Sequence, residues 1–352
     1  MINIKTKNTN YQVIINKNFF NHEINKLQLT KKKIYIIIDR KIFHLLKKLK
    51  TQNNLHIIQV SAGEKIKSFN YYEKIATKIL KQKVDRSSCI IAIGGGTICD
   101  LSGFLASSIL RGIDFIIIPT TLLSQVDASV GGKNGINSKY GKNLIGTFYQ
   151  PNKVIIDISF LESLSKREIK SGYAEIFKHA LIKDVKFYKW LCINYKKILD
   201  LQPKYIKKAI AKSIEIKSYF ITKDENEKLI NLNSRAILNF GHTFGHALET
   251  IGMYNNQLTH GEAISVGMSL ASQISREMGL ISNDEYNAII DHFDKVDLPF
   301  YDKRISYNKF YNLMLSDKKN TDGKINLILL KKIGKAYFEK GFRIKDIKKL
   351  LK

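Results

Sequence analysis

Three of the chain's eight histidines, His242, His246 and His260, lie within a stretch of 19 residues. Imidazole is the commonest metal ligand in proteins, and residues four apart on a helix, such as His242 and His246, share one face. Upstream, Glu175 and His179 have the same spacing. Two histidines, one carboxylate and an open position are typical of a catalytic zinc. These residues predict a metal site, and more than one combination of them could supply the ligands.

An isolated histidine on a helix is more often packed or solvated than bound to a metal, but clustering of this kind favours a metal role. Cys89, Cys99 and Cys192 lack the paired spacing of a structural zinc site. We therefore expect a catalytic metal site and not a structural one.

A strand expected at 89–93 runs into Gly94, Gly95 and Gly96 and then into a helix. Glycine lets the backbone approach a pyrophosphate, and N–H groups at a helix start bind its charge. The turn indicates a dinucleotide site, although it departs from the usual Gly-x-Gly-x-x-Gly pattern. A tight strand-to-helix turn needs glycine for steric reasons alone, so this alternative stays open.

Residues 119–134 and 141–146 mix polar, charged, glycine and apolar residues over a segment too long for a simple turn. Long loops of this kind are usually functional. We expect a functional loop here, and the alternative is a surface crossover that carries solvated lysines.

The elements that position these residues divide the chain into two expected domains. Runs of β-branched residues predict buried strands at 33–39, 55–60, 89–93, 115–118 and 154–157, with helices at 71–83 and 98–109. This alternation predicts a Rossmann-like, doubly wound, mainly parallel α/β domain over 1–160. From 161 to 352 we expect a mostly helical domain that binds metal and substrate, with helices at 168–182, 203–222, 235–251 and 262–278 and a small hairpin at 325–330 and 336–339.

The formal net charge of +27 would by itself suggest a nucleic-acid partner. The lysines are spread along the whole chain without interleaved aromatic residues or a recognisable binding motif, so we expect no such partner. No apolar run of about 18 residues and no signal-peptide pattern occurs, so we expect no membrane partner. Three cysteines without a pairing motif agree with a reducing compartment, which predicts a cytoplasmic protein.

A series of motifs follows in order along nearly the whole chain. They are Gly-Gly-Gly-x-x-x-Asp at 94–100, Pro-Thr-Thr-Leu-Leu-Ser-Gln-Val-Asp-x-Ser-Val-Gly-Gly-Lys at 119–133, Gly-Lys-Asn-Leu-Ile-Gly at 141–146, Gly-x-Ala-Glu-x-x-Lys at 172–178, Leu-Asn-x-Gly-His-Thr-Phe-Gly-His-Ala at 238–247 and His-Gly-Glu-Ala at 260–263. Together they closely resemble the 3-dehydroquinate synthase family of sugar phosphate cyclases.

The resemblance implies conversion of 3-deoxy-D-arabino-heptulosonate 7-phosphate to 3-dehydroquinate and phosphate, in the shikimate pathway. It implies catalytic NAD, one divalent metal ion (zinc or cobalt) and a homodimer. The implied sequence of steps is transient oxidation by NAD, elimination of phosphate, reduction, and an intramolecular aldol closure.

The resemblance also assigns residues to roles. The implied metal ligands are Glu175, His242 and His260, and the implied catalytic residues are His246, Glu227, Lys133, Asp127 and Asn143. The implied substrate residues are Arg111, which would reach into the partner subunit's site, Asp127, Lys133, Asn143, Lys178, Lys217, Arg235, Asn239 and one of Lys318 and Lys319. The implied cofactor residues are Asp39, Gly63, Glu64, Lys65, Ile66, Lys67, Gly95, Gly96, Thr97, Ile98, Cys99, Asp100, Thr120, Thr121, Lys133, Lys142, Phe160, Leu161, Glu162 and Ser163.

Two features depart from the family pattern. Cys99 stands where the family usually has glycine, and 227–235 is several residues longer than usual, which could displace Glu227. Two alternatives share the expected fold: a related cyclase that makes an aminocyclitol precursor, and a metal-dependent polyol dehydrogenase that releases NADH. Arg235 and Lys217 favour a carboxylated substrate and count against the first alternative.

Overall fold

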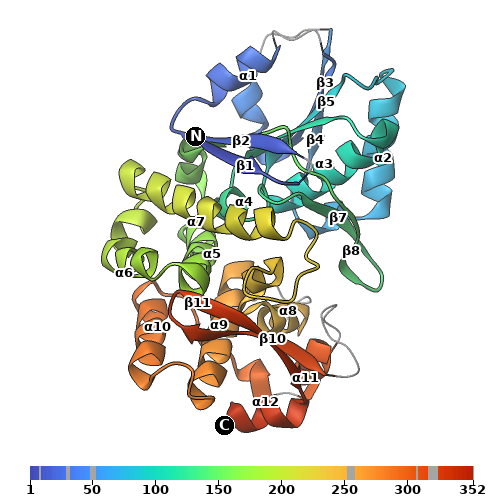
Figure 1. Ribbon diagram of the computed structural model, residues 1–352. Coiled ribbons are helices and arrows are strands. Elements are labelled where there is room, and N and C mark those ends of the chain that lie inside the picture. Colours follow the sequence, from blue (N-terminus) through green and yellow to red (C-terminus); the bar gives the residue numbers. More distant parts are fainter. Residues whose placement is uncertain are drawn as a thin grey trace. The chain divides into compact units, whose positions relative to one another are not determined.

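The computed structural model describes residues 1–7, 9–28, 32–47, 53–251, 258–306, 308–315 and 324–351. The chain divides into two compact units, Met1–Leu164 and Ser165–Lys352, whose elements are labelled in Figure 1. Within the described ranges, no helix is both long and apolar enough to cross a membrane.

A seven-stranded sheet forms the centre of the first unit. Its order is β1 (Ile2–Lys5), β2 (Asn10–Asn16), β9 (Lys153–Asp157), β6 (Asp114–Pro119), β5 (Cys89–Gly94), β3 (Ile34–Asp39) and β4 (Leu55–Val60). Only the pair β1–β2, among the described strands of this sheet, is antiparallel. The predicted doubly wound, mainly parallel α/β domain is confirmed, and the first two strands are additional to the predicted set.

The central strands of this sheet are buried along nearly their whole length. Their apolar side chains on both faces need cover from water, which helices provide. On one face, α1 (Phe20–Gln28) and the 3₁₀ helix η4 (Ile158–Ser163) pack on the isoleucines of β3 and β5. Phe20 and Phe160 meet there edge to face, with ring centroids 5.2 Å apart. Among the described residues, the other α-helices of the unit are α2 (Phe69–Lys81), α3 (Gly96–Ser108) and α4 (Leu122–Val126), and its other 3₁₀ helices are η1 (Arg40–Leu46), η2 (Glu64–Ile66) and η3 (Ile109–Arg111).

Residues 119–134 and 141–146, which the sequence predicted as a long loop, contain a helix and two strands. The prediction of a loop is wrong for those residues. Residues 122–126 form α4, and β7 (Lys133–Ser138) pairs antiparallel with β8 (Gly141–Phe148). Gly135 pairs with Gly146, and a Cβ built on Gly135 would lie 2.5 Å from the carbonyl oxygen of Ile145. The two strands approach so closely that only glycine fits.

The second unit is mostly helical, as predicted. Its α-helices in the described ranges are α5 (Lys166–Lys183), α6 (Val185–Leu199), α7 (Pro203–Lys223), α8 (His242–Ile251), α9 (His260–Glu277), α10 (Asn283–Lys295), α11 (Asn308–Leu315) and α12 (Ile344–Leu350), and the 3₁₀ helix η7 (Lys303–Ser306) precedes α11. The predicted hairpin is present as β10 (Ile325–Lys332) and β11 (Lys335–Phe342).

The single helix predicted at 235–251 is wrong. A 3₁₀ helix, η5 (Arg235–Asn239), comes first, and α8 begins at His242 after a break. Gly241 has a φ of 79°, a left-handed conformation that glycine adopts readily and that cannot continue an α-helix. The break places His242 at the first position of a new helix.

Candidate functional site

Glu175, His242 and His260 come together in the second unit and form the candidate metal centre. Their ligand atoms all lie within 4.8 Å of one another. Oε1 of Glu175 is 3.6 Å from Nε2 of His242 and 3.4 Å from Nε2 of His260. Ligands about 2.1 Å from a tetrahedral zinc ion lie about 3.4 Å apart, so both distances fit one shared ion.

The environment of Glu175 also fits a metal. Its side chain is fully buried, and Oε1 has no hydrogen-bond partner among the described residues. A buried carboxylate oxygen without a partner is costly, and a divalent ion would satisfy it. Two imidazoles and a carboxylate are hard-to-borderline ligands that suit zinc or cobalt.

Close contacts between helices bring the three ligands together, because each ligand stands on a different helix. A Cβ built on Gly261 would lie 2.2 Å from the carbonyl oxygen of Ser171, so α9 begins directly against α5. A Cβ built on Gly267 would lie 2.0 Å from the carbonyl oxygen of Gly241, so α8 begins directly against α9. Larger side chains at either glycine would separate the ligands.

Capping interactions fix the start of α9, where His260 stands. The Thr259 side chain accepts from the Glu262 backbone N–H, and the Glu262 carboxylate accepts in return from the Thr259 backbone. Arg167 on α5 donates to both carboxylate oxygens of Glu262, at 2.6 and 2.7 Å. The Gly-Glu pair that follows His260 therefore ties this helix start to α5.

Each ligand also contacts a group on its outer side. Lys178, which is 1% exposed, donates to Oε2 of Glu175. Nδ1 of His242 lies 3.1 Å from the carbonyl oxygen of Phe240, and Nδ1 of His260 lies 3.4 Å from Oε1 of Glu249. Such partners orient a ligand and adjust its basicity.

Charges around the site shift two pKa values in opposite directions. Burial alone would raise the pKa of Glu175, but the positive charges of Lys178 and His260 hold it well below its ordinary value. Burial alone would lower the pKa of His260, but the carboxylates of Glu175 and Glu249 raise it to about 10. The carboxylate is therefore ionised and ready to bind a cation.

The other two histidines of the predicted cluster lie outside the triad. His246 is exposed on α8, and its ring centroid is 5.3 Å from that of His242. His179 is fully buried, and its Nδ1 lies 2.6 Å from the hydroxyl of Ser213. The i, i+4 spacing thus identified the neighbourhood of the site, whereas the ligand set includes a histidine from another helix.

Cations predicted to bind an anionic substrate are buried in the second unit. Lys178, Lys217 and Arg235 are 1%, 6% and 2% exposed. Arg235 donates from its side chain to the carbonyl oxygen of Glu225 at 2.7 Å. Lys178 also pairs with Glu175, so this cation brings positive charge to the metal centre.

The long 225–235 segment is organised by Asp224, a residue that the sequence interpretation missed. Its carboxylate accepts from the backbone N–H groups of Lys228, Leu229 and Arg235. Glu227 remains beside another predicted site residue, because Nδ2 of Asn239 donates to its Oε1 at 2.8 Å. Lys318 and Lys319 lie outside the described residues.

In the first unit, the glycine turn lies where the strand order reverses. From β3 the chain passes outward to β4 and then returns to β5 on the other side of β3. Asp39 ends β3 and Gly94 ends β5, so both stand at this switch point. Open α/β sheets bind nucleotides outside the carboxyl ends of strands at such a point.

The start of α3 fits a phosphate group. Gly95 occupies the N-cap position, and because it has no side chain it cannot cap the first N–H groups of the helix. Anions bind to helix starts of this kind. Ile98 and Cys99 are buried, so only their backbones could face a cofactor, and burial raises the pKa of the Cys99 thiol.

A polar network joins three of the predicted cofactor and substrate segments. Lys67, which is buried, donates to Asp100 at 2.5 Å and also to Oδ1 of Asn143. Asn137 accepts from the backbone N–H of Asn143 at 2.9 Å and donates to Oε1 of Glu64 at 2.6 Å. Asn143 has a φ of 54°, and the bond that its N–H donates to Asn137 supports this left-handed conformation. Asn137 was not predicted, since no motif singles it out.

The remaining predicted residues of the first unit have varied surroundings. Thr121 caps α4, with Ser124 completing the capping box, and Lys133 is exposed at the start of β7. Phe160 and Leu161 are buried. Glu162 pairs with Lys17 at 2.8 Å, and the backbone N–H of Gly63 donates to the Thr97 hydroxyl at 3.4 Å. The described part of the chain also contains the other predicted residues of this unit, which are Lys65, Ile66, Gly96, Thr120, Asp127, Lys142 and Ser163.

Arg111 follows α3 in a strained segment. Leu110 and Arg111 have φ values of 50° and 66°, in the left-handed region that non-glycine residues rarely adopt. The 13 residues of α3 extend about 20 Å at about 1.5 Å per residue, so Arg111 and Gly95 stand at opposite ends of the helix.

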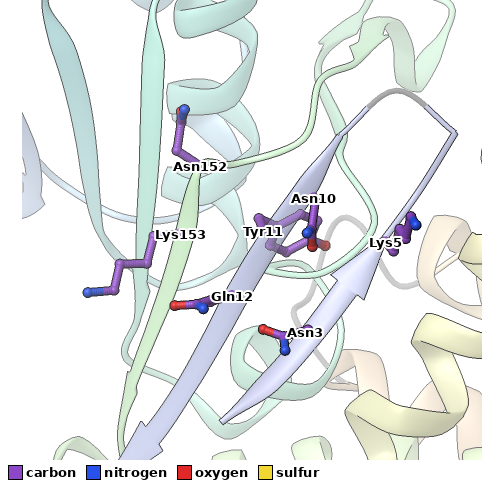
Figure 2. A pocket seen from close by; sticks show the side chains of 7 residues that line it. All are labelled: Asn3, Lys5, Asn10, Tyr11, Gln12, Asn152 and Lys153. Carbon is purple, nitrogen blue, oxygen red and sulfur yellow. The ribbon is translucent and has the colours of Figure 1, made fainter.

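Two surface hollows lie apart from the predicted ligands. One, of about 560 Å³, is lined by Asn3, Lys5, Asn10, Tyr11, Gln12, Asn152 and Lys153. Figure 2 shows these side chains on β1 and β2, at the first residue of β9, and at Asn152, which directly precedes β9. The second, of about 600 Å³, borders the Arg167–Glu262 pair. Neither hollow contains a predicted site residue.

Comparisons with known proteins identify the family of the chain. The 3-dehydroquinate synthase N-terminal family model matches residues 57–171, and the C-terminal family model matches residues 172–320. The chain is 41% identical to 3-dehydroquinate synthase of Pelagibacter ubique, with 100% of this chain and 97% of that protein covered. It is also 41% identical to the enzyme of Helicobacter pylori, with 94% and 92% covered.

Solved structures with the same fold include two cyclase-type synthases. A 2-deoxy-scyllo-inosose synthase complexed with carbaglucose-6-phosphate, NAD⁺ and Co²⁺ matches with a TM-score of 0.87 at 25% identity, over 99% of this chain and 98% of that one. The 2-epi-5-epi-valiolone synthase of Streptomyces hygroscopicus, with NAD⁺ and Zn²⁺ bound, matches with a TM-score of 0.86 at 24% identity, over 99% and 97%. Both family models and full-length relatives point the same way, and the chain belongs to the 3-dehydroquinate synthase family.

Proposed function

We propose that this chain is a 3-dehydroquinate synthase, which converts 3-deoxy-D-arabino-heptulosonate 7-phosphate to 3-dehydroquinate and phosphate in the shikimate pathway. The observation that carries the proposal is the triad of buried Glu175 and His242 and partly buried His260, formed within motifs of this family. Because phosphate leaves by elimination from carbon, the enzyme is a carbon–oxygen lyase.

NAD and one divalent ion, zinc or cobalt, are the proposed cofactors. NAD⁺ would accept a hydride from the substrate and return it later in the cycle, and the ion would stabilise negative charge on substrate oxygens. Glu175, His242 and His260 would hold the ion. The turn at Gly95 and Gly96 and the polar network of Lys67 and Asp100 would hold the dinucleotide, with the other cofactor residues that the family pattern assigns.

The chain's own residues bind and orient a substrate that carries a carboxylate and a phosphate. Buried Lys178, Lys217 and Arg235 supply positive charge, and Arg235 suits bidentate pairing with one of these anions. Lys133, Asp127 and Asn143 are proposed contacts from the first unit. The positive charge of Lys178, Lys217 and Arg235 favours an anionic ligand over a neutral polyol.

Proton handling is proposed for His246 and Glu227. His246 is exposed one turn from the ligand His242, so it can exchange protons with solvent and substrate. The hydrogen bond from Asn239 to Glu227 orients that carboxylate within the segment that also carries Arg235.

The proposed assembly is a homodimer in which Arg111 contributes to the partner's site. Support comes from the position of Arg111 at the far end of α3 from the glycine turn, in a conformation that costs free energy. A cytoplasmic location is also proposed, which the three free cysteines support.

The test is phosphate release from the heptulosonate phosphate by the purified protein, with and without NAD and a metal chelator. We expect release that requires NAD and the metal, without net NADH. Stoichiometric NADH absorbance would replace this proposal with a polyol dehydrogenase, and turnover of glucose 6-phosphate alone would replace it with a related cyclase.

A further inference from the structure

The ring of His260 lies between two carboxylates. Its Nε2 is 3.4 Å from Oε1 of Glu175, and its Nδ1 is 3.4 Å from Oε1 of Glu249. Glu175 stands on α5 and Glu249 on α8, so groups from two helices hold the ring at the start of a third. The Glu249 side chain is 18% exposed, which shields this contact from much of the solvent.

We propose that Glu249 is a positioning residue of the metal centre, whose carboxylate accepts the Nδ1 proton of His260 and so presents Nε2 to the ion. The inference rests on the proposed function, because it concerns the same metal centre. Glu249 belongs to none of the ligand, substrate or cofactor sets that the family pattern assigns.

The physical reason lies in the two forms of a neutral imidazole. One ring nitrogen carries the proton and the other has a lone pair, and the hydrogen bond at one nitrogen decides which is which. A carboxylate on the outer nitrogen fixes the proton there, orients the ring and makes the inner nitrogen a stronger ligand. Glu249 is placed to do all three for His260.

The other two ligands also contact a group on the side that faces away from the shared ligand atoms. Lys178 contacts the second oxygen of Glu175, and the Phe240 carbonyl lies 3.1 Å from Nδ1 of His242. His260 differs because its outer partner is a carboxylate, which carries a full negative charge. We therefore expect Glu249 to influence metal affinity more than a carbonyl partner would.

Glu249 is not a direct ligand in this arrangement. Its Oε1 approaches Nδ1, whereas Nε2 is the nitrogen that faces Glu175. The two nitrogens point in different directions from the ring, so the imidazole stands between Glu249 and the shared ligand atoms.

The test is the Zn²⁺ affinity of the metal-stripped, full-length protein, measured by competition with a chromophoric chelator. We expect Glu249→Ala to bind Zn²⁺ about 10–100-fold more weakly than the wild type, the range found when such outer partners are removed. Glu249→Gln should show a smaller loss, because its amide oxygen still accepts the Nδ1 proton without the charge. The visible absorption of bound Co²⁺ should shift in both variants.

Glu215→Gln is the matched control, since Glu215 is half-exposed on α7 and pairs with Lys212 at 2.8 Å. It should keep wild-type affinity. Thermal unfolding of the metal-free variants reports any loss of structure, which the isosteric glutamine minimises. Wild-type affinity and an unchanged Co²⁺ spectrum in both Glu249 variants would overturn the inference. No substrate enters the measurement, so failure of phosphate release would count against the proposed function alone.

Discussion

The backbone N–H of Gly261 donates a hydrogen bond to the hydroxyl of Ser171 at 2.9 Å. This bond joins the start of α9, next to His260, to the helix that carries Glu175. The distance between two of the three metal ligands therefore depends on a contact that involves neither of them.

Gly261→Ala should separate these ligands. The added Cβ would lie 2.2 Å from the Ser171 carbonyl oxygen and 2.4 Å from its Cα, so α9 has to move away from α5. We expect a loss of about 3 kcal/mol in the free energy of unfolding, together with weaker Zn²⁺ binding. Urea denaturation and chelator competition measure the two effects.

Ser171→Ala is the control, because it removes the hydroxyl and adds no atoms. It should cost about 1 kcal/mol and leave Zn²⁺ affinity close to wild type. Equal effects of the two substitutions would show that the hydrogen bond, and not the close approach, sets the position of α9.

His242→Ala should abolish metal-dependent turnover, because it removes one of the three ligands. Zinc content by elemental analysis and phosphate release report the two losses. His246→Ala should keep its zinc and still lose turnover, since His246 lies outside the triad. Full zinc content in His242→Ala would remove His242 from the ligand set.

Arg235→Ala should mainly weaken substrate binding. A hydrogen bond to a charged group contributes about 1.5–3 kcal/mol, so KM should rise about 10–100-fold with a smaller change in kcat. Arg235→Lys should give an intermediate KM, because lysine keeps the charge without the bidentate geometry. Steady-state phosphate release at varied substrate concentration decides the matter, and an unchanged KM contradicts the assignment.

Buried His292 predicts a loss of stability in acid. Burial lowers its pKa to about 4, against about 6.5 in the unfolded chain. Between these values the unfolded state takes up a proton that the folded state does not, so the free energy of unfolding falls as pH falls from about 6.5 to about 4. The loss should reach about 3 kcal/mol at pH 4, since each pKa unit contributes about 1.36 kcal/mol.

The comparison for this prediction is His292→Phe, which keeps the stacking on Phe177 and cannot titrate. The variant loses the hydrogen bond to Tyr173, but that cost is the same at every pH. Urea denaturation from pH 7 to pH 4 should therefore give a shallower slope for the variant. Parallel curves would mean that His292 does not cause the acid loss.

The sequence predicted those strands whose position follows from a local run of β-branched residues. Strand β4 was placed at its observed bounds, and β3 and β5 within one residue, because buried parallel strands are continuous β-branched runs. The 235–251 helix was wrong because hydrophobic spacing does not reveal the left-handed φ of Gly241. The β7–β8 hairpin was missed because its glycines, required by close strand contact, read as loop residues.

The sequence predicted where the candidate site lies in the chain, but not the distances between its residues. Clustered histidines located it and the family resemblance implied Glu175, His242 and His260 as ligands, whereas the distances between them depend on the packing of α9 against α5. Glu249 and Asp224 gave no signal, since a single acidic residue near a motif has no distinguishing spacing. Their roles arise from contacts between segments that only the folded chain brings together.

Arg111 provides a test of the proposed dimer. If Arg111 acts in the partner's site, a subunit with Arg111→Ala and a subunit with His242→Ala can form a mixed dimer with one intact site. That site combines His242 of the first subunit with Arg111 contributed by the second. Each homodimer of either variant has two defective sites and should be inactive.

Mixing the two variants under conditions of subunit exchange should restore activity. At equal amounts, half of the dimers are mixed and each has one intact site, so about a quarter of wild-type phosphate release is expected. If Arg111 acts within its own subunit, each mixed dimer instead has one subunit without Arg111 and one without His242, and no site is intact. Activity that stays at the level of the separate variants, although mixed dimers form, would therefore place Arg111 in its own subunit's site.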